Sequence, residues 1–126
     1  MTREERHQCY KALERIINEC SNPNWNGYSA DAISMDVVYK TLGILNVQSY
    51  QPFISPTLRN SIQFDFDFQE LDLHLEFEVS NNDAIPYLVC YHGVIKEGAV
   101  SSGKDIDTKV KQELHKHGGE LYDNQY

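Results

Sequence analysis

The sequence predicts an α+β fold in which an antiparallel sheet of three to four strands packs against two N-terminal helices and one C-terminal helix. Apolar side chains recur at intervals of three and four residues near both ends of the chain, which is the spacing of amphipathic helices. Between these ends, apolar and polar side chains alternate along two consecutive runs, as in half-buried strands. A length of 126 residues with 40% hydrophobic content suffices for one core, so we expect a single domain over residues 1–119 and a flexible tail over 120–126.

Two helices are expected before the sheet. Thr2 and Glu5 have the spacing of a capping box, and the apolar positions that follow predict a helix over residues 3–20. Pro23 cannot continue this helix, because proline lacks the amide that an α-helix requires. Ser34 is a favoured N-cap ahead of a second apolar stripe, so a second helix is expected to begin there.

A β-hairpin is expected in the middle of the chain. Alternation over residues 62–68 and 71–79 predicts two antiparallel strands. Residues 69–70 are not a favoured two-residue turn, so the sequence also allows a longer connection. Before the hairpin, residues 53–54 lie between prolines and predict a short edge strand.

The last third of the chain is expected to complete the sheet and add a helix. Residues 86–92 predict a third long strand and residues 94–100 a fourth, with Gly93 allowing a bend between them. Apolar residues at helical spacing over 104–117 predict the C-terminal helix, and Gly118 is suited to end it.

The formal net charge of −8, from 11 Lys and Arg against 19 Asp and Glu, is concentrated in one segment. Residues 60–95 contain no Lys or Arg, and their acidic residues are Asp65, Asp67, Glu70, Asp72, Glu76, Glu78 and Asp83. This balance argues against direct binding to nucleic acid or to an anionic membrane surface, because both need an excess of Lys and Arg. The partner class that complements the segment is a basic protein.

We expect the hairpin to present its charge on one face, because alternate side chains of a strand point to the same side. The candidate partner-binding residues are Asp65, Asp67, Asp72, Glu76 and Glu78. A face with one sign of charge fits a basic partner and can imitate the phosphates that a nucleic-acid-binding protein recognises. An ordinary solvated sheet face is the alternative, although such faces usually mix both signs because like charges across strands are destabilising.

A metal site among the same side chains is a second alternative. His74 and Glu76 stand two residues apart on one strand and, with neighbouring carboxylates, have the ligand types of a divalent ion. The chain contains no P-loop, no dinucleotide-binding glycine pattern and no zinc-protease motif. We therefore expect a non-enzymatic interaction module without a cofactor, with a metal-dependent domain as one alternative and a homodimer joined through the second half of the sheet as another.

The chain is expected to be cytoplasmic. No apolar stretch follows its first residues, so no secretory signal is expected, and the apolar run over residues 84–91 is too short to cross a bilayer. The three cysteines form no C-x-x-C pair. Cys9 and Cys20 are spaced to share one helix face, where we expect them to be small core residues.

The loop before the second predicted helix contains the one tryptophan of the chain. It reads W-N-G-Y-S-A over residues 25–30, and its Asn-Gly dipeptide tolerates the positive φ of a tight turn. We expect Trp25, Gly27 and Tyr28 to form a structural motif in which the two aromatic rings hold the loop against the sheet. A ligand-stacking role for the rings is the alternative.

Together with the segments that follow, this loop resembles a family of small bacterial and phage proteins. The family pattern consists of a W-(D/N)-G-Y-x-A loop, a Ser-capped helix, a P-x-(I/V)-x-P segment and a strand. The matching positions in this chain are residues 25–30, Ser34, residues 52–56 and residues 62–66.

The resemblance extends over residues 24–80, with two departures. The chain has Arg59-Asn60 where the family has Asp-Gly, and Phe66 where the family has Trp. The resemblance implies the fold and a phage or mobile-element setting, and it implies no particular chemistry. In such a setting, an acidic protein could inhibit a host defence protein that binds nucleic acid.

Overall fold

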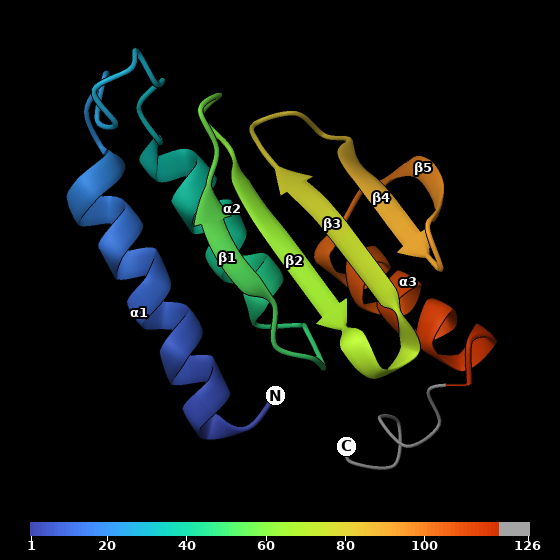
Figure 1. The fold of residues 1–126 in the computed structure, drawn as a ribbon. Coiled ribbons are helices and arrows are strands. Elements are labelled where there is room, and N and C mark those ends of the chain that lie inside the picture. Colours follow the sequence, from blue (N-terminus) through green and yellow to red (C-terminus); the bar gives the residue numbers. More distant parts are fainter. Residues whose placement is uncertain (119–126) are drawn as a thin grey trace.

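The computed structural model describes residues 1–118, in which three α-helices and five β-strands form an α+β fold (Figure 1). The elements are α1 (Arg3–Cys20), α2 (Met35–Leu45), β1 (Phe53–Pro56), β2 (Ile62–Phe68), β3 (Leu73–Val79), β4 (Ile85–Tyr91), β5 (Val94–Val100) and α3 (Gly103–Lys116). The predicted fold class and the order of its helices are confirmed. The sheet has one strand more than predicted, because β1 pairs with β2 over its whole length.

Both N-terminal helices begin with the predicted side-chain caps. Before α1, Thr2 Oγ1 accepts a hydrogen bond from the Glu5 amide at 3.1 Å, and Glu5 Oε1 accepts one from the Thr2 amide at 2.7 Å. Before α2, Ser34 Oγ accepts a hydrogen bond from the Val37 amide at 3.4 Å. These contacts satisfy amides that have no partner within the helix, so each cap stabilises the fold by about 1 kcal/mol.

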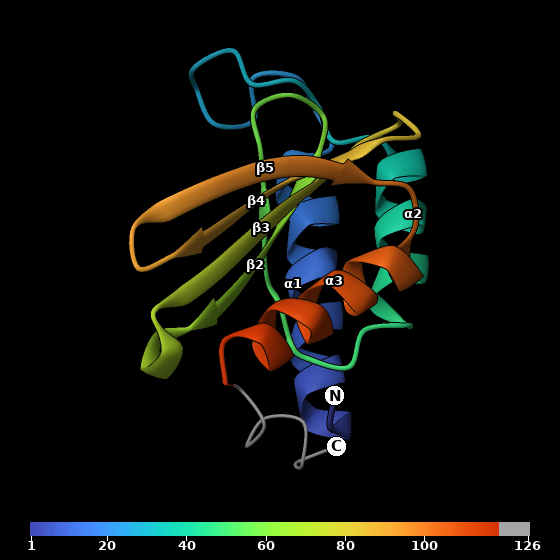
Figure 2. The ribbon, with the colours of Figure 1, turned by 90° about the vertical axis from the view of Figure 1, so that its right-hand side faces the viewer.

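The strands form one antiparallel sheet in chain order, β1-β2-β3-β4-β5. Alternate strand side chains point to the side on which all three helices lie, and together with the helices they form the core (Figure 2). The largest fully buried side chains are Val37, Leu45, Ile62, Phe64, Phe66, Leu73, Leu75, Phe77, Val79, Ile85, Ile106 and Leu114. None of the helices within residues 1–118 covers the opposite face of the sheet.

The turns of the β2–β3 and β4–β5 hairpins differ. Between β2 and β3, a 3-10 helix (Gln69–Leu71) is followed by Asp72 in the left-handed region with a φ of 51°, so the longer connection that the sequence allows is present. Between β4 and β5, the two-residue turn His92-Gly93 has φ values of 49° and 78°. Positive φ at both residues matches the twist of the flanking strands, which explains a glycine at the second position.

The cysteines behave as the spacing predicts. Cys9 and Cys20 are buried on the inner face of α1, and burial raises the pKa of both thiols. Cys90 on β4 is partly exposed, and all three cysteines carry free thiols.

No helix within residues 1–118 has the length and apolar character needed to cross a bilayer. The predicted tail over residues 120–126 lies outside the described residues, so the domain assignment stays a prediction.

Candidate functional site on the open face of the sheet

We call the sheet surface opposite the helices the open face. The pairing register determines which side chains meet there: Asp65 on β2 lies opposite Glu76 on β3, and Asp67 lies opposite His74. Further along the same row, Glu76 lies beside Leu88 on β4, which in turn lies beside Glu97 on β5. Because directly opposite residues of an antiparallel pair point to the same side, side chains from four strands converge on one surface.

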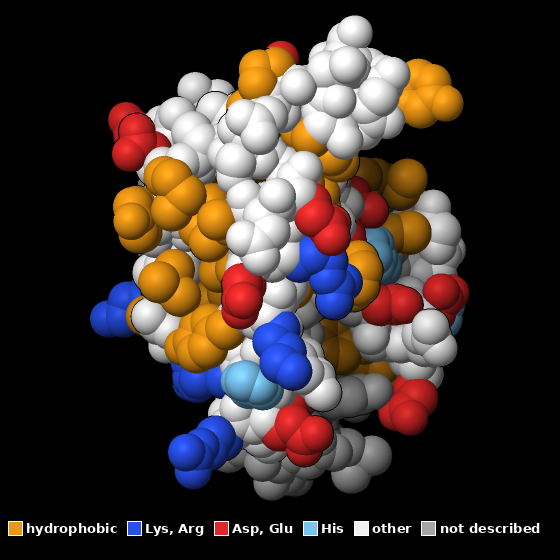
Figure 3. Space-filling model, turned by 90° about the vertical axis from the view of Figure 1, so that its left-hand side faces the viewer, with side chains coloured by type: hydrophobic (Ala, Val, Ile, Leu, Met, Phe, Trp, Pro, Cys, Tyr) orange, Lys and Arg blue, Asp and Glu red, His pale blue; other side chains and the backbone are white. Residues whose placement is uncertain are grey.

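Acidic side chains dominate the charge of this surface. The charged groups that β2, β3, β4 and β5 direct to the open face are Asp65, Asp67, His74, Glu76, Glu78 and Glu97. Figure 3 shows the contrast with the flank of the molecule, where Lys, Arg, Asp and Glu intermingle over α1, whereas red acidic side chains and a histidine gather towards the sheet. The helix surface therefore carries both signs of charge, whereas the ionised strand side chains of the open face are predominantly acidic.

His74 lies in the centre of the acidic side chains. Its Nε2 atom is 3.0 Å from Glu76 Oε1 and 3.5 Å from Asp65 Oδ1, and its Nδ1 atom is 3.7 Å from Asp67 Oδ1. A protonated imidazole at this position offsets part of the repulsion between Asp65 and Glu76, which lie directly opposite each other.

Glu78 differs from its neighbours because a cation of this chain already neutralises it. An Arg59 guanidinium nitrogen lies 2.8 Å from Glu78 Oε1, and the Ser61 hydroxyl donates to Glu78 Oε2 at 2.6 Å. The hydrogen bond from Arg59, assisted by that from Ser61, holds the pKa of Glu78 below its ordinary value, although partial burial opposes the shift. No other carboxylate of the open face forms an ion pair with a Lys or Arg of residues 1–118.

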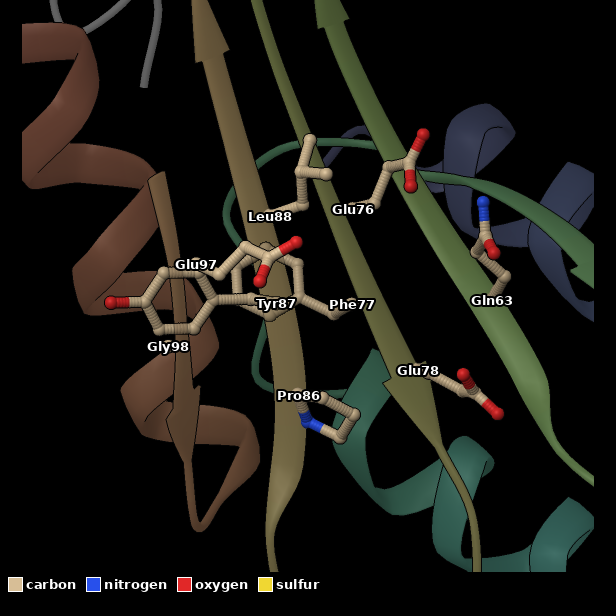
Figure 4. A pocket seen from close by; sticks show the side chains of 9 residues that line it. All are labelled: Gln63, Glu76, Phe77, Glu78, Pro86, Tyr87, Leu88, Glu97 and Gly98. Carbon is tan, nitrogen blue, oxygen red and sulfur yellow. The ribbon is translucent and has the colours of Figure 1, made fainter. Parts of the chain in front are cut away.

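A cleft of about 290 Å³ lies in this surface. Figure 4 shows Glu76, Glu78 and Glu97 around its rim, with Leu88 and Pro86 between them. A floor of apolar side chains inside a ring of carboxylates is suited to a side chain with an aliphatic stem and a cationic tip.

The structure brings together four of the five predicted partner-binding residues: Asp65, Asp67, Glu76 and Glu78. Asp72 is separate, because it belongs to the turn between β2 and β3, where its carboxylate lies 3.1 Å from His92 Nδ1. Sequence reasoning missed Glu97. Residues 94–100 were predicted as a strand without an alternating pattern, so only the register of β5 against β4 places Glu97 beside Leu88 on the open face.

The loop of residues 25–30 is anchored by one aromatic ring rather than two. Trp25 packs against the core, and its Nε1 donates to the Asp31 carbonyl at 2.8 Å. The expectation for Tyr28 is wrong, because its side chain is 86% exposed. The loop needs no second ring, since Asn26 Oδ1 accepts hydrogen bonds from the amides of residues 28 and 30, and Gly27 adopts a φ of 78°.

Three side chains of the open face could hold a metal ion. Asp65 joins the predicted pair of His74 and Glu76, and one ligand atom from each lies within 4.8 Å of the others. Metal–ligand distances near 2.1 Å place the ligands of a tetrahedral ion roughly 3.4 Å apart. The two spacings from His74 Nε2, 3.5 Å to Asp65 Oδ1 and 3.0 Å to Glu76 Oε1, are close to this value. One imidazole and two carboxylates suit Zn²⁺ or Mn²⁺.

We compared the chain with protein-family models, with curated proteins and with solved structures, and found no match to any of them. The resemblance of residues 24–80 is therefore unsupported by these comparisons, and the function has to be argued from the open face itself.

Proposed function

We propose that the protein is a non-enzymatic interaction module that binds a basic protein partner through its open face. One observation carries the proposal: the open face has five carboxylates and one histidine, and only Glu78 among the carboxylates is neutralised by a Lys or Arg of the described chain. Complementary charge steers and orients a partner, so the surface selects a basic protein over nucleic acid or an anionic membrane. Two copies of this face would repel each other, which argues against a homodimer formed through it.

The cleft supplies a natural anchor point for such a partner. An arginine side chain fits best, because its stem can lie on Leu88 and Pro86 while its planar guanidinium meets Glu76 and Glu97. Arginine is among the residues that contribute most of the binding energy in many protein interfaces.

The partner that we favour is a nucleic-acid-binding protein, since the carboxylates can occupy a surface that ordinarily receives phosphates. The narrower hypothesis, a phage-encoded inhibitor of a host defence protein, depends on the resemblance of the loop at residues 25–30 and its neighbours. A cytoplasmic location belongs to the same proposal and agrees with the three free thiols.

The test compares two variants with the same change in net charge. Asp67→Lys/Glu76→Lys reverses the open face, and Glu14→Lys/Glu19→Lys reverses two exposed carboxylates of α1. Binding of a fluorescent octa-arginine peptide is followed by anisotropy at low salt and at physiological salt. We expect the open-face variant to lose at least about tenfold in affinity and the α1 variant to change little. Equal losses in both variants would show that only the bulk charge matters, and the proposal would then fail.

A metal-binding domain is the second candidate function, and the three converging ligand atoms of Asp65, His74 and Glu76 favour it. Calorimetric titration with Zn²⁺, Mn²⁺ and Mg²⁺, repeated on His74→Gln, tests it. A saturable heat that His74→Gln abolishes would support the metal site. Absence of heat, together with an unchanged melting temperature in the presence of each ion, would exclude it.

A further inference from the structure

A second hollow, which we call the basic groove, lies on the helix side of the sheet between the β4–β5 hairpin and the C-terminal end of α3. Its defining residues are Val89, Tyr91, Val94, Lys96, Lys116 and His117. Figure 2 shows α3 passing beneath these strands, with its C-terminal end on the side of their connecting turn. The groove has a volume of about 300 Å³, at the lower end of the roughly 300–1,000 Å³ typical of ligand pockets.

The groove exists because α3 ends before the hairpin does. Val89 pairs with Lys96 and Tyr91 with Val94, so all four side chains point to the helix side of the sheet. Val89 is buried at 4% exposure beneath the helix, whereas Val94 remains 61% exposed. The apolar surface of the core therefore continues into the groove, where none of the described helices packs over it.

Aromatic rings form a preorganised part of the lining. The His117 ring stacks on Tyr91, with centroids 3.6 Å apart and an interplanar angle of 23°. His92 adds a third ring, 4.1 Å from Tyr91. Glu113 fixes the orientation of His117 through a contact of 3.1 Å between Oε2 and Nε2.

The charge of the groove is positive in a protein whose net charge is −8. Its one acidic group, Glu113, is buried, and its other carboxylate oxygen lies 3.1 Å from Lys109 Nζ. Burial alone would raise the pKa of Glu113, but Lys109 and the nearby Lys116 hold it below its ordinary value, so the carboxylate stays ionised and paired. Neither Lys96 nor Lys116 forms an ion pair with any carboxylate of residues 1–118, although Lys116 is near enough to Glu113 to lower its pKa.

We propose that the basic groove binds a small aromatic carboxylate, whose ring packs against Val94, Tyr91 and His117 while its anionic group is held by Lys96 and Lys116. The argument is one of charge complementarity: aromatic and aliphatic walls meet two cations that have no ion-pair partner within residues 1–118, in a space that fits one or two rings. This assignment does not rest on the function proposed for the open face, which lies on the other side of the sheet.

The experiment is a titration of the isotope-labelled full chain with benzoate, benzamide and benzamidine, followed by amide NMR shifts. The three probes share one ring and a similar shape, and they carry a negative charge, no charge and a positive charge. We expect benzoate to bind in the millimolar range, as a probe of this size allows, and at least about fivefold more tightly than benzamide. The shifts should be concentrated at Val89, Tyr91, Val94 and the last turn of α3.

Two variants test the role of the lysines. Lys96→Gln/Lys116→Gln should weaken benzoate binding at least about fivefold. The control Lys104→Gln removes an exposed lysine from the other end of α3 and should leave the affinity unchanged. Equal affinity for all three probes, shifts scattered over the surface, or full binding by the double variant would each overturn the assignment.

Discussion

The like charges that face each other across β2 and β3 lead to a quantitative prediction about stability. Asp65 and Glu76 are direct cross-strand neighbours, and their nearest ligand oxygens lie within 4.8 Å. Two unit charges at that separation repel by about 0.9 kcal/mol in bulk water and by more where protein displaces solvent. We therefore expect Asp65→Asn and Glu76→Gln each to raise the free energy of unfolding by about 0.5–1 kcal/mol.

The double variant provides the sharper measurement. Once one carboxylate is neutral the repulsion is gone, so the second substitution should add little. The sum of the two single changes in unfolding free energy should therefore exceed the change in the double variant by about 0.5–1 kcal/mol. Both substitutions preserve shape and retain an oxygen that can accept the hydrogen bonds from Gln63 and His74. In 1 M salt, where the screening length is about 3 Å, most of the gain should disappear.

Urea unfolding at pH 8, where a histidine side chain ordinarily carries no charge, measures these values on protein dialysed against a chelator. Glu14→Gln on α1 is the matched control, because it removes a carboxylate from a surface that carries both signs and should not stabilise the fold. If both open-face substitutions destabilise the protein, or if their effects add, then Asp65 and Glu76 do not repel each other and the reasoning is wrong.

Three further predictions concern two residues at the open face and the cap of α2. Gly98→Ala places a methyl group against the hydroxyl and ring of Tyr87, so we expect urea unfolding to register a loss of about 1–3 kcal/mol. Arg59→Gln removes the contact that lowers the pKa of Glu78. In the unsubstituted protein, the stability that this ionised carboxylate contributes is present at neutral pH and is lost as pH falls through the lowered pKa. The melting temperature of the variant should therefore depend less on pH across the acid range than that of the unsubstituted protein. Ser34→Ala removes the cap of α2 and should cost about 1 kcal/mol by thermal unfolding.

The parts of the fold that could be predicted from the sequence are those that local physics determines. Thr2 and Ser34 cap helices because short polar side chains satisfy the first amides wherever a helix begins. The alternation over residues 62–68 predicted which side chains of β2 enter the core, because the period of a strand is two. The one-signed open face followed from the same rule.

The remaining features depend on contacts that no local pattern contains. Glu97 joins the cleft only through the register of β5 against β4, and Arg59 reaches Glu78 from a loop that sequence alone does not orient. Tyr28 was misassigned because asparagine side chains, and not its ring, hold the loop. The basic groove depends on the exact length of α3 relative to the hairpin, which boundary signals fix only to within a few residues.

The two proposed sites meet at consecutive residues of β5, because Lys96 points into the basic groove and Glu97 to the open face. Exchanging the two residues, as Lys96→Glu/Glu97→Lys, keeps composition, net charge and strand propensity while putting each charge on the wrong side. Both positions are exposed, so stability should change by less than about 0.5 kcal/mol. We expect this single variant to weaken benzoate binding in the groove and octa-arginine binding on the open face together. Unchanged benzoate binding would refute the role of Lys96, and unchanged peptide binding would refute that of Glu97, so the two inferences stand or fall separately.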